Sequence, residues 1–452
     1  MQTSFSLAQL ADPNVAESEK ILRACVHCGF CTATCPTYVL LGDELDSPRG
    51  RIYLIKEMLE HDRPATGEVV KHIDRCLSCL SCMTTCPSGV HYMHLVDHAR
   101  THIEKTYTRP LADRALRALL AFLMPYPARF RVALRAASLA KPLAPLFTAL
   151  GLDRLASMLR LAPAHVPAAG PRPGAVFQAE GTRRGRVAIL RNCANEARAP
   201  KINDAAIRLL TRHGVEVVLP QGEGCCGGLV HHMGKEHAAL AQARANVDAW
   251  TREIEAGGLD AILATASGCG TTLKDYGFML RTDPAYAEKA ARVSSLAKDI
   301  SEYVTGLAIA PRGPTGFTVA YHAACSLQHG QKVTREPKEL LGRAGFQVKD
   351  VPEGHLCCGS AGTYNILQPA IAQRLAARKA ANIARLSPDV IATGNLGCMI
   401  QIGAVTGTPI VHSVELLDWA TGGPKPAALA GAKDLQAVQV EDQITRSPQR
   451  AM

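Results

Sequence analysis

The sequence predicts a multi-domain α+β protein, in which a helical head precedes two repeated α/β units with parallel sheets. Two observations predict this architecture. Half of the sixteen cysteines form two copies of one tight spacing near the N-terminus, and the other half form two copies of a wider spacing. Between the widely spaced cysteines, apolar segments of strand length alternate with segments of helical periodicity, as in α/β folds.

The N-terminal cysteines follow the pattern C-x2-C-x2-C-x3-C-P twice, at Cys25, Cys28, Cys31 and Cys35, and at Cys76, Cys79, Cys82 and Cys86. Bacterial-type ferredoxins hold [4Fe–4S] clusters with this run, and the fourth cysteine of each run ligates the other cluster. The pattern therefore predicts a two-cluster, ferredoxin-like domain over residues 1–110. Cluster 1 would use Cys25, Cys28, Cys31 and Cys86, and cluster 2 would use Cys76, Cys79, Cys82 and Cys35.

A zinc site and a disulfide framework are the alternatives for these eight cysteines. Structural zinc usually takes separated C-x2-C pairs rather than four cysteines within eleven residues followed by proline. Because the predicted ligands cross between the two runs, we expect metal binding and folding of the head to be coupled.

The composition narrows the class of function. The chain has 452 residues and a net charge of +10, which could favour an acidic partner or an anionic membrane surface. No basic run is interleaved with aromatic residues, so nucleic acid is not an expected partner. The N-terminus carries Asp12, Glu17 and Glu19 and has no long apolar core, unlike a signal peptide. We therefore expect a cytoplasmic protein with reduced thiols.

Residues 111–162 form the most apolar region and are expected to be a helical connecting segment. Arginines and prolines interrupt it, so no apolar stretch approaches the ~20 residues that a transmembrane helix needs. Two interpretations stay open: short amphipathic helices that pack on a partner or on the chain's own core, or basic helices that touch a membrane or a quinone-bearing complex. Residues 163–186, rich in proline, alanine and glycine, are expected to be a linker.

The remaining cysteines define two CCG units, expected at residues 187–310 and 311–421. In each unit 31 residues separate a single cysteine from a Cys-Cys-Gly sequence, and another cysteine follows: Cys193, Cys225, Cys226 and Cys269, then Cys325, Cys357, Cys358 and Cys398. Expected strands are 187–190, 215–219, 261–264, 317–321, 346–351 and 390–392, and expected helices are 202–213, 236–255, 338–344 and 369–386. Residues 422–452 are expected to be a flexible tail.

Each of these eight cysteines is expected at the end of a strand or in the loop that follows, where α/β sheets collect ligands. Two interpretations compete: a further metal or redox centre in the CCG units, or a fold signature whose cysteines hold no iron. The nearby histidines could ligate a metal, relay protons or bind an anion, or could be ordinary satisfied histidines: His231, His232, His322, His329 and His355. His322, three residues before Cys325, is the first to test.

Residues 25–38, 40–52 and 76–90, together with the two CCG units, resemble the heterodisulfide-reductase-like iron–sulfur family, and within it the iron–sulfur subunits of glycolate oxidases. The resemblance covers about residues 7–417. It implies an electron-transfer subunit without catalytic residues, paired with FAD-binding glycolate oxidase subunits that oxidise glycolate to glyoxylate. Electrons would pass from FAD through the two clusters to a quinone or another acceptor. The sequence has no G-x-G-x-x-G after a strand and no G-x-x-x-x-G-K-[ST], in agreement with a flavin on the partner.

The chain departs from the wider family in one respect. In heterodisulfide reductases each CCG unit ends in C-x-x-C, whereas here Ala266 and Thr272 flank Cys269, and Asn395 and Gln401 flank Cys398. A four-cysteine site or none is therefore expected. The alternatives are the equivalent subunit of a lactate or anaerobic glycerol-3-phosphate dehydrogenase, a thiol–disulfide enzyme of the heterodisulfide reductase type, and a scaffold with structural clusters.

Overall fold

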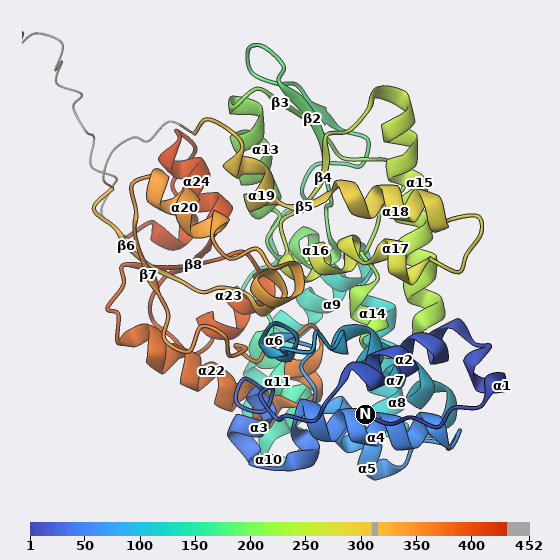
Figure 1. Ribbon diagram of the computed structural model, residues 1–452. Coiled ribbons are helices and arrows are strands. Elements are labelled where there is room, and N and C mark those ends of the chain that lie inside the picture. The colour runs from blue at the N-terminus through green and yellow to red at the C-terminus, as the bar shows by residue number, and fades with distance from the viewer. Residues whose placement is uncertain (310–314, 432–452) are drawn as a thin grey trace, which may run out of the picture.

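The computed structural model describes residues 1–309 and 315–431 (Figure 1). The head is helical: α1 (Leu7–Leu10), α2 (Pro13–Ala24), α3 (Pro36–Leu41), η1 (Glu44–Asp46), α4 (Pro48–Glu60), α5 (Gly67–Asp74), α6 (Ser81–Thr85) and α7 (Tyr92–Thr106). Its core lies between α2, α4, α5 and α7, where Ile55, Ile73 and Leu95 are fully buried. Pro36, which closes the first cysteine run, starts α3 directly after Cys35 with its φ already helical.

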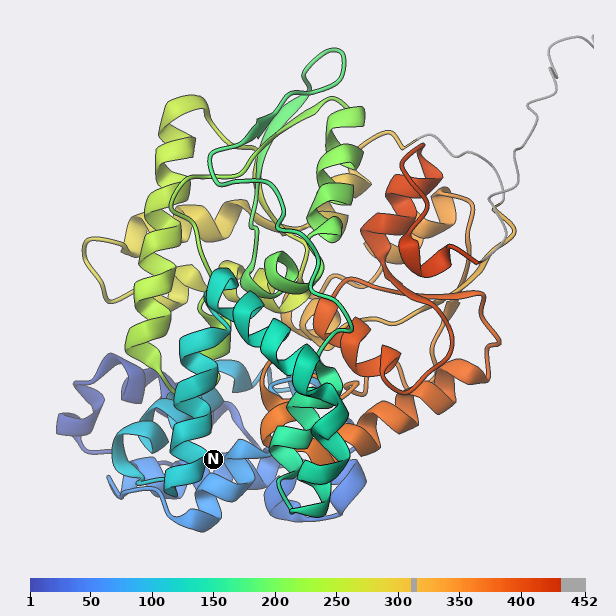
Figure 2. The same ribbon diagram turned by 180° about the vertical axis from the view of Figure 1, so that it is seen from behind.

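The connecting segment folds into α8 (Leu111–Leu123), α9 (Pro127–Ala140), η2 (Lys141–Leu143), α10 (Ala144–Ala149) and α11 (Asp153–Leu161). Figure 2 shows these helices crossing the back of the molecule between the head and the CCG units. The segment is tied to the head by Arg109 and Arg117, which both bind Asp74 at 2.6 and 2.8 Å. At its other end, α9 and α11 pack on helices of both CCG units. No helix in the described ranges is long and apolar enough to cross a membrane.

The first CCG unit contains a five-stranded sheet in the order β1-β3-β2-β4-β5. Its strands are β1 (Val176–Phe177), β2 (Gly185–Ile189), β3 (Val215–Val218), β4 (Ala261–Ala264) and β5 (Ala297–Asp299). All are parallel except β1, which pairs antiparallel with β3. The helices are α12 (Cys193–Arg198), α13 (Lys201–Arg212), α14 (Gly228–His231), α15 (Glu236–Gly257), α16 (Ser267–Lys274), α17 (Tyr276–Met279), α18 (Ala287–Leu296) and α19 (Ile300–Thr305).

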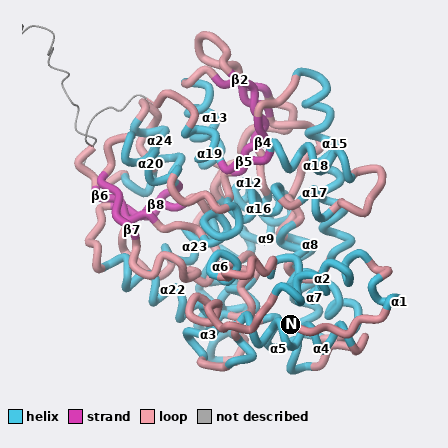
Figure 3. Tube along the Cα trace, viewed as in Figure 1, coloured by secondary structure: helices cyan, strands magenta, loops and turns pink. Residues whose placement is uncertain are grey.

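The second CCG unit contains a parallel sheet in the order β7-β6-β8-β9. Its strands are β6 (Thr318–Tyr321), β7 (Gln347–Asp350), β8 (Val390–Thr393) and β9 (Ile410–His412). Its helices are η3 (Ser326–Gln331), α20 (Glu336–Arg343), α21 (Tyr364–Leu367), α22 (Pro369–Ala384), α23 (Leu396–Gly403), α24 (Ser413–Ala420) and η4 (Ala427–Leu429). The order repeats β3-β2-β4-β5 of the first unit, which confirms the predicted duplication of a parallel α/β unit (Figure 3).

The two units share one hydrophobic core. Val187 and Leu263 of the first sheet belong to the same buried cluster as Val319 and Val390 of the second. Since these central strands are buried on both faces, they consist of continuous apolar residues, as parallel strands do. The shared core fixes the two sheets relative to each other and, with them, the loops that carry the cysteines.

Three strands were not expected from the sequence. β5 and β9 have three residues each, and β1 lies inside the segment expected to be a linker. The boundary expected between residues 310 and 311 lies outside the described residues, as does the expected tail from residue 432 onward.

Candidate metal centres

One four-cysteine set lies at the surface of the head, where the two ferredoxin-type runs meet. Three cysteines of the first run and two of the second line one cavity: Cys25, Cys28, Cys31, Cys82 and Cys86. Cys28 is exposed, as are the neighbouring side chains of Val26 and Phe30. Burial and then the charge of Cys25 raise the pKa of the Cys31 thiol to about 11, so this thiol needs a cation to ionise at neutral pH. The four cysteines predicted for cluster 1 are among them, together with Cys82, which is predicted for cluster 2.

The second set lies deeper in the head and brings the last cysteine of the first run to three cysteines of the second: Cys35, Cys76, Cys79 and Cys82. Burial raises the pKa of the Cys79 thiol well above its usual value, and the next largest contributions come from the charges of Cys325 and Cys35. Burial likewise raises the pKa of Cys82, followed by the charges of Cys79, Cys76 and Cys35. This set matches the four ligands predicted for cluster 2.

The two runs share an unusual backbone conformation. The residue before the second cysteine has a positive φ in both runs, at His27 (56°) and Ser78 (48°), and so does the residue after it, at Gly29 (85°) and Leu80 (62°). Such left-handed residues are costly when they are not glycine, and they occur mainly where a functional loop is held in one shape. The duplicated conformation indicates that both loops are shaped for the same kind of ligand.

A buried charge network surrounds Cys35, and the sequence did not reveal it. Arg51 is fully buried, pairs with Asp46 at 3.2 Å, and reaches Cys35 Sγ at 3.8 Å. Asp46 also accepts bonds from His72 and Arg75 at 2.9 and 2.7 Å, so its carboxylate is fully compensated. In the sequence, these charged residues give no sign that they form a network. The fold shows that their segment is buried, and a buried charge needs a partner.

In the first CCG unit the four cysteines converge at the carboxyl ends of three parallel strands. Cys193 Sγ lies 3.5 Å from Cys225 Sγ. Hydrogen bonds from the thiols of Cys225 and Cys269 lower the pKa of Cys226, which favours a thiolate at the centre of the group. The glycine of the motif is required: Gly227 has φ 88°, and a Cβ there would lie 2.9 Å from the carbonyl oxygen of Ala239 in α15.

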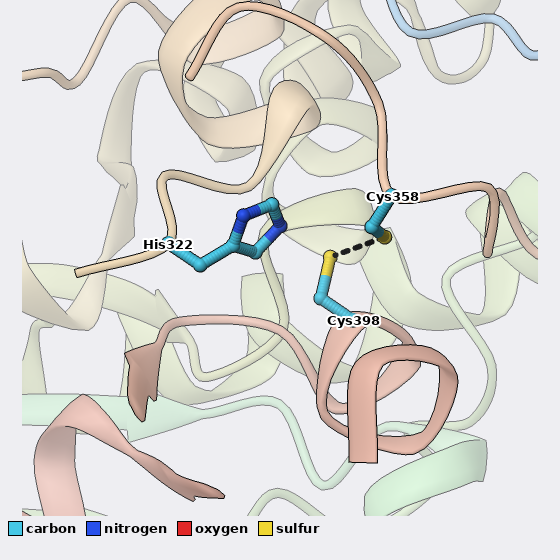
Figure 4. Close-up of side chains that lie close together, drawn as sticks. All are labelled: His322, Cys358 and Cys398. Carbon is cyan, nitrogen blue, oxygen red and sulfur yellow. Dashed lines mark hydrogen bonds between the residues drawn. The ribbon is translucent and has the colours of Figure 1, made fainter. Parts of the chain in front are cut away.

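The second CCG unit repeats this arrangement and adds a histidine. Cys325 Sγ lies 3.4 Å from Cys357 Sγ, and Cys358 Sγ lies 3.4 Å from Cys398 Sγ. Hydrogen bonds from the thiols of Cys357 and Cys398 lower the pKa of Cys358. A ring nitrogen of His322 and the sulfurs of Cys358 and Cys398 all lie within 4.8 Å of one another (Figure 4).

One expectation about these sites is corrected. Cys193, Cys269 and Cys398 were expected at the ends of strands or in the loops that follow, but they lie in the first turns of α12, α16 and α23. The reason is that β2, β4 and β8 pass almost directly into these helices, so each cysteine still sits at the carboxyl end of the sheet.

The other candidate histidines have different surroundings. His231 and His232 face the carboxylate of Asp97 in α7, at 3.5 and 3.2 Å, and so join the first unit to the head. His329 pairs with Thr84 Oγ1 at 2.7 Å, and burial lowers its pKa to about 4. His355 is exposed, and burial of part of its ring lowers its pKa. Of these five histidines, His322 is grouped with two cysteine sulfurs within 4.8 Å, and the charge of His232 contributes to lowering the pKa of Cys226.

The donor sets fit iron–sulfur chemistry. Within residues 1–309 and 315–431, which hold all sixteen cysteines, every cysteine is a free thiol. They form four groups of four, two in the head and one in each CCG unit, and thiolate sulfur is the ligand of iron–sulfur clusters. The fold and these sites define an iron–sulfur protein with a dicluster head and two cysteine-rich units.

Comparison with known proteins supports this class. Residues 21–90 match a 4Fe-4S dicluster domain, and residues 187–274 and 319–403 match a cysteine-rich domain. The chain is 42% identical to the glycolate oxidase iron-sulfur subunit of Escherichia coli, over 93% of this chain and 99% of that protein. The chain belongs to the family of glycolate oxidase iron–sulfur subunits.

The chain is also similar to more distant relatives. A probable glycolate oxidase iron-sulfur subunit of Bacillus subtilis is 32% identical over 89% of this chain and 94% of its own length. Lactate utilization protein A of the same species is 24% identical over 52% of this chain and 99% of its own length. The crystal structure of a hypothetical protein from Helicobacter pylori has a TM-score of 0.55 with 13% identity, covering 92% of this chain and 74% of that one, so it shares the fold.

Proposed function

We propose that this chain is the electron-transfer subunit of a glycolate oxidase. In this proposal a partner subunit oxidises glycolate to glyoxylate on FAD, and the electrons pass through clusters 1 and 2 of the head to a quinone or another acceptor. The observation that carries the proposal is that the structure brings cysteines of the two runs together, with Cys25, Cys28, Cys31, Cys82 and Cys86 around one cavity that opens at the surface. The family relationship supports glycolate as the substrate of the complex.

The geometry of the head supports a direction for the electrons. The cluster 1 set has an exposed cysteine flanked by the exposed apolar side chains of Val26 and Phe30. A partner that covers this surface would bring its flavin close to cluster 1. The cluster 2 set lies next to Cys325 of the second CCG unit, which leads away from that surface. The chain's own groups at these sites are thiols and donors to sulfur, so hydride chemistry falls to the partner.

The test is anaerobic purification of the complete complex, followed by addition of glycolate without an acceptor. We expect electron paramagnetic resonance (EPR) signals of reduced clusters to appear, and to disappear when a quinone analogue is added. Clusters that dithionite reduces but glycolate does not would contradict the proposal for this substrate. A chain that binds no iron would contradict it altogether.

Lactate is the second candidate substrate, because the lactate utilization protein of Bacillus subtilis is a relative. In this proposal the iron–sulfur subunit does not touch the substrate, so the same experiment is repeated with lactate and with glycerol 3-phosphate. Reduction of the clusters by one of these compounds alone would move the assignment to the corresponding dehydrogenase. Turnover of a heterodisulfide by the isolated chain would favour the thiol–disulfide alternative.

The connecting helices offer a surface for peripheral membrane contact, where a quinone would be available. Their large apolar side chains are exposed, including Phe122 (56%), Val132 (64%), Leu139 (85%) and Leu150 (63%). Arginines lie between them, and a basic amphipathic surface of this kind binds anionic lipid. We expect the complex to co-sediment with vesicles of anionic lipid and not with vesicles of neutral lipid.

A further inference from the structure

His322 is a buried histidine whose polar contact is with cysteine sulfur. It is 1% exposed, neither ring nitrogen bonds an oxygen or nitrogen within the described part of the chain, and a hydrogen bond with His322 contributes to lowering the pKa of Cys358. A buried polar group without an oxygen or nitrogen partner is costly, so the nearby sulfurs are the groups against which this ring is placed. The ring points at the sulfurs of Cys358 and Cys398 (Figure 4), and imidazole nitrogen and thiolate sulfur are both metal ligands.

The two CCG units differ at this position. In both, the central strand leads to a cysteine, but the residue three positions before that cysteine is His322 in the second unit and Leu190 in the first. Leu190 is fully buried and has no atom that can ligate a metal. The second unit therefore offers one imidazole and four thiols, whereas the first offers four thiols. The difference indicates that the two sites do not hold the same centre.

The second site also adjoins the head. Cys325 and Cys357 pack in the same cluster of side chains as Cys79, a predicted ligand of cluster 2. Around this contact, Tyr364 donates to the carbonyl oxygen of Arg75 at 2.9 Å, and Thr84 pairs with His329. A centre bound here would therefore lie beside cluster 2, where electrons can pass directly between them.

A cationic side chain lies close to the second site. Lys379 is 2% exposed and donates to the carbonyl oxygen of Glu353 at 2.8 Å, and the charges of all four cysteines of the site act on its ammonium group. A nearby cation favours the reduced form of a centre because it offsets the negative charge, and a neutral imidazole ligand adds no negative charge, whereas a fifth thiolate would. The site is therefore suited to accept electrons.

We propose that the second CCG unit holds a redox-active iron–sulfur centre ligated by His322 together with Cys325, Cys357, Cys358 and Cys398. In each transfer cluster 2 loses one electron and this centre gains it, and the terminal acceptor later removes that electron. The flavin of the partner supplies the electrons, so the inference rests on the proposed electron-transfer function. The first unit has no corresponding histidine ligand.

The test uses the full chain, purified anaerobically with 15N-labelled histidine and reduced in steps. We expect an EPR signal beyond those of clusters 1 and 2, with hyperfine coupling to a histidine nitrogen. The coupling should be absent in His322→Ala and in His322→Cys. His322→Cys keeps a donor and should retain the centre, but with a midpoint potential lowered enough to change its reduced fraction at least tenfold, about 59 mV for one electron.

His329→Ala is the matched control, because it removes another buried histidine of the same unit whose ring nitrogens bond Thr84 and the carbonyl oxygen of His355. This variant should keep the nitrogen coupling. Coupling that survives in His322→Cys, an unshifted potential, or zinc in place of iron at this site would each overturn the inference. Iron limited to about eight atoms per chain, all in two reducible cubane clusters, would overturn it while leaving the proposed function intact. Absence of those two clusters would instead contradict the proposed function.

Discussion

The hydroxyl of Tyr92 gives a direct test of cluster 2 at the scale of one hydrogen bond. Tyr92 is buried, and its hydroxyl donates to Cys76 Sγ at 3.8 Å. Hydrogen bonds to ligand sulfur stabilise the reduced form of a cluster. We expect Tyr92→Phe to lower the potential of cluster 2 by up to about 40 mV, the equivalent of one hydrogen bond of about 1 kcal/mol. Redox titration followed by EPR measures this shift.

Tyr276→Phe is the control for this variant, because the Tyr276 hydroxyl bonds Asn246 and the carbonyl oxygen of Cys226 in the first CCG unit. It should leave the potentials of the head unchanged. Equal shifts in the two variants would show that the effect of Tyr92 is not local to Cys76.

The shift in potential caused by Tyr92→Phe can also test whether the ligands cross between the two runs. Cys86 and Cys82 of the second run line the cavity of the first, whereas the charges of Cys35 and Cys76 both act on Cys82. We expect Cys86→Ser to disrupt cluster 1, so that the remaining cluster still responds to Tyr92→Phe. Cys35→Ser should disrupt cluster 2, so that the remaining cluster no longer responds. The opposite result in the two double variants would mean that each run ligates its own cluster.

How far the sites could be predicted differs from residue to residue. The eight cysteines of the head form tight runs that spacing reveals directly, and the eight of the CCG units are revealed by the repetition of one wide spacing. His322 could not be separated from four other histidines, since only the fold places its ring against Cys358 and Cys398. The bond from Arg51 to Cys35 was likewise hidden, because a charged side chain gives no sign in the sequence that it will be buried.

At the scale of elements, long and periodic segments were predictable and short edge strands were not. The strand at Ala261–Ala264 was predicted with the observed bounds, and the helix expected at 236–255 is observed at Glu236–Gly257. β5 consists of Ala297, Lys298 and Asp299, with no apolar run to reveal it. It exists because it pairs with β4, so its stability comes from its neighbour and not from its own sequence.

His412 connects two elements of different units and predicts a dependence of stability on pH. It caps α24, where Nδ1 accepts from the amide of Val414, and its Nε2 therefore carries the proton that it donates to the carbonyl oxygen of Thr265 at 2.9 Å. Burial lowers the pKa of His412 to about 4, so the folded state holds the neutral ring. The unfolded chain, with a pKa near 6.5, binds the proton first, and stability is lost as the pH falls from about 6.5 towards 4.

As the pH falls from 7.5 to 5.5, protonation of His412 in the unfolded chain should lower the free energy of unfolding by about 1 kcal/mol. We expect the free energy of unfolding of His412→Asn to fall by about 1 kcal/mol less than that of the unchanged chain over this pH range. At pH 7.5 the variant should be the less stable of the two. Chemical denaturation of the anaerobic full chain measures the difference, with the exposed His165→Asn as a control that should follow the unchanged chain. If the difference in free energy of unfolding between the His412 variant and the unchanged chain stays constant from pH 7.5 to 5.5, the pH dependence does not come from His412.

At the scale of the whole molecule, the head depends on iron in a way that the CCG sheets do not. α6 has only five residues and begins at Leu80 in a left-handed conformation, so it is too short to be stable by itself. We expect its cysteines to stabilise it, because a metal with crossed ligands would join α6 to the first run. The CCG units, in contrast, share a buried core that needs no metal to exclude water.

Removal of iron should therefore loosen the molecule unevenly. We expect a chelator under mildly oxidising conditions to raise amide hydrogen exchange first in residues 25–35 and in α6. The increase should spread to η3 and α21, which are tied to the head through His329 and Tyr364, while β2, β4 and β8 stay protected. Exchange measured by mass spectrometry before and after treatment gives the order. Uniform loss of protection would show that the head and the CCG units unfold as one cooperative body, and unchanged exchange in α6 would show that its fold does not require the clusters.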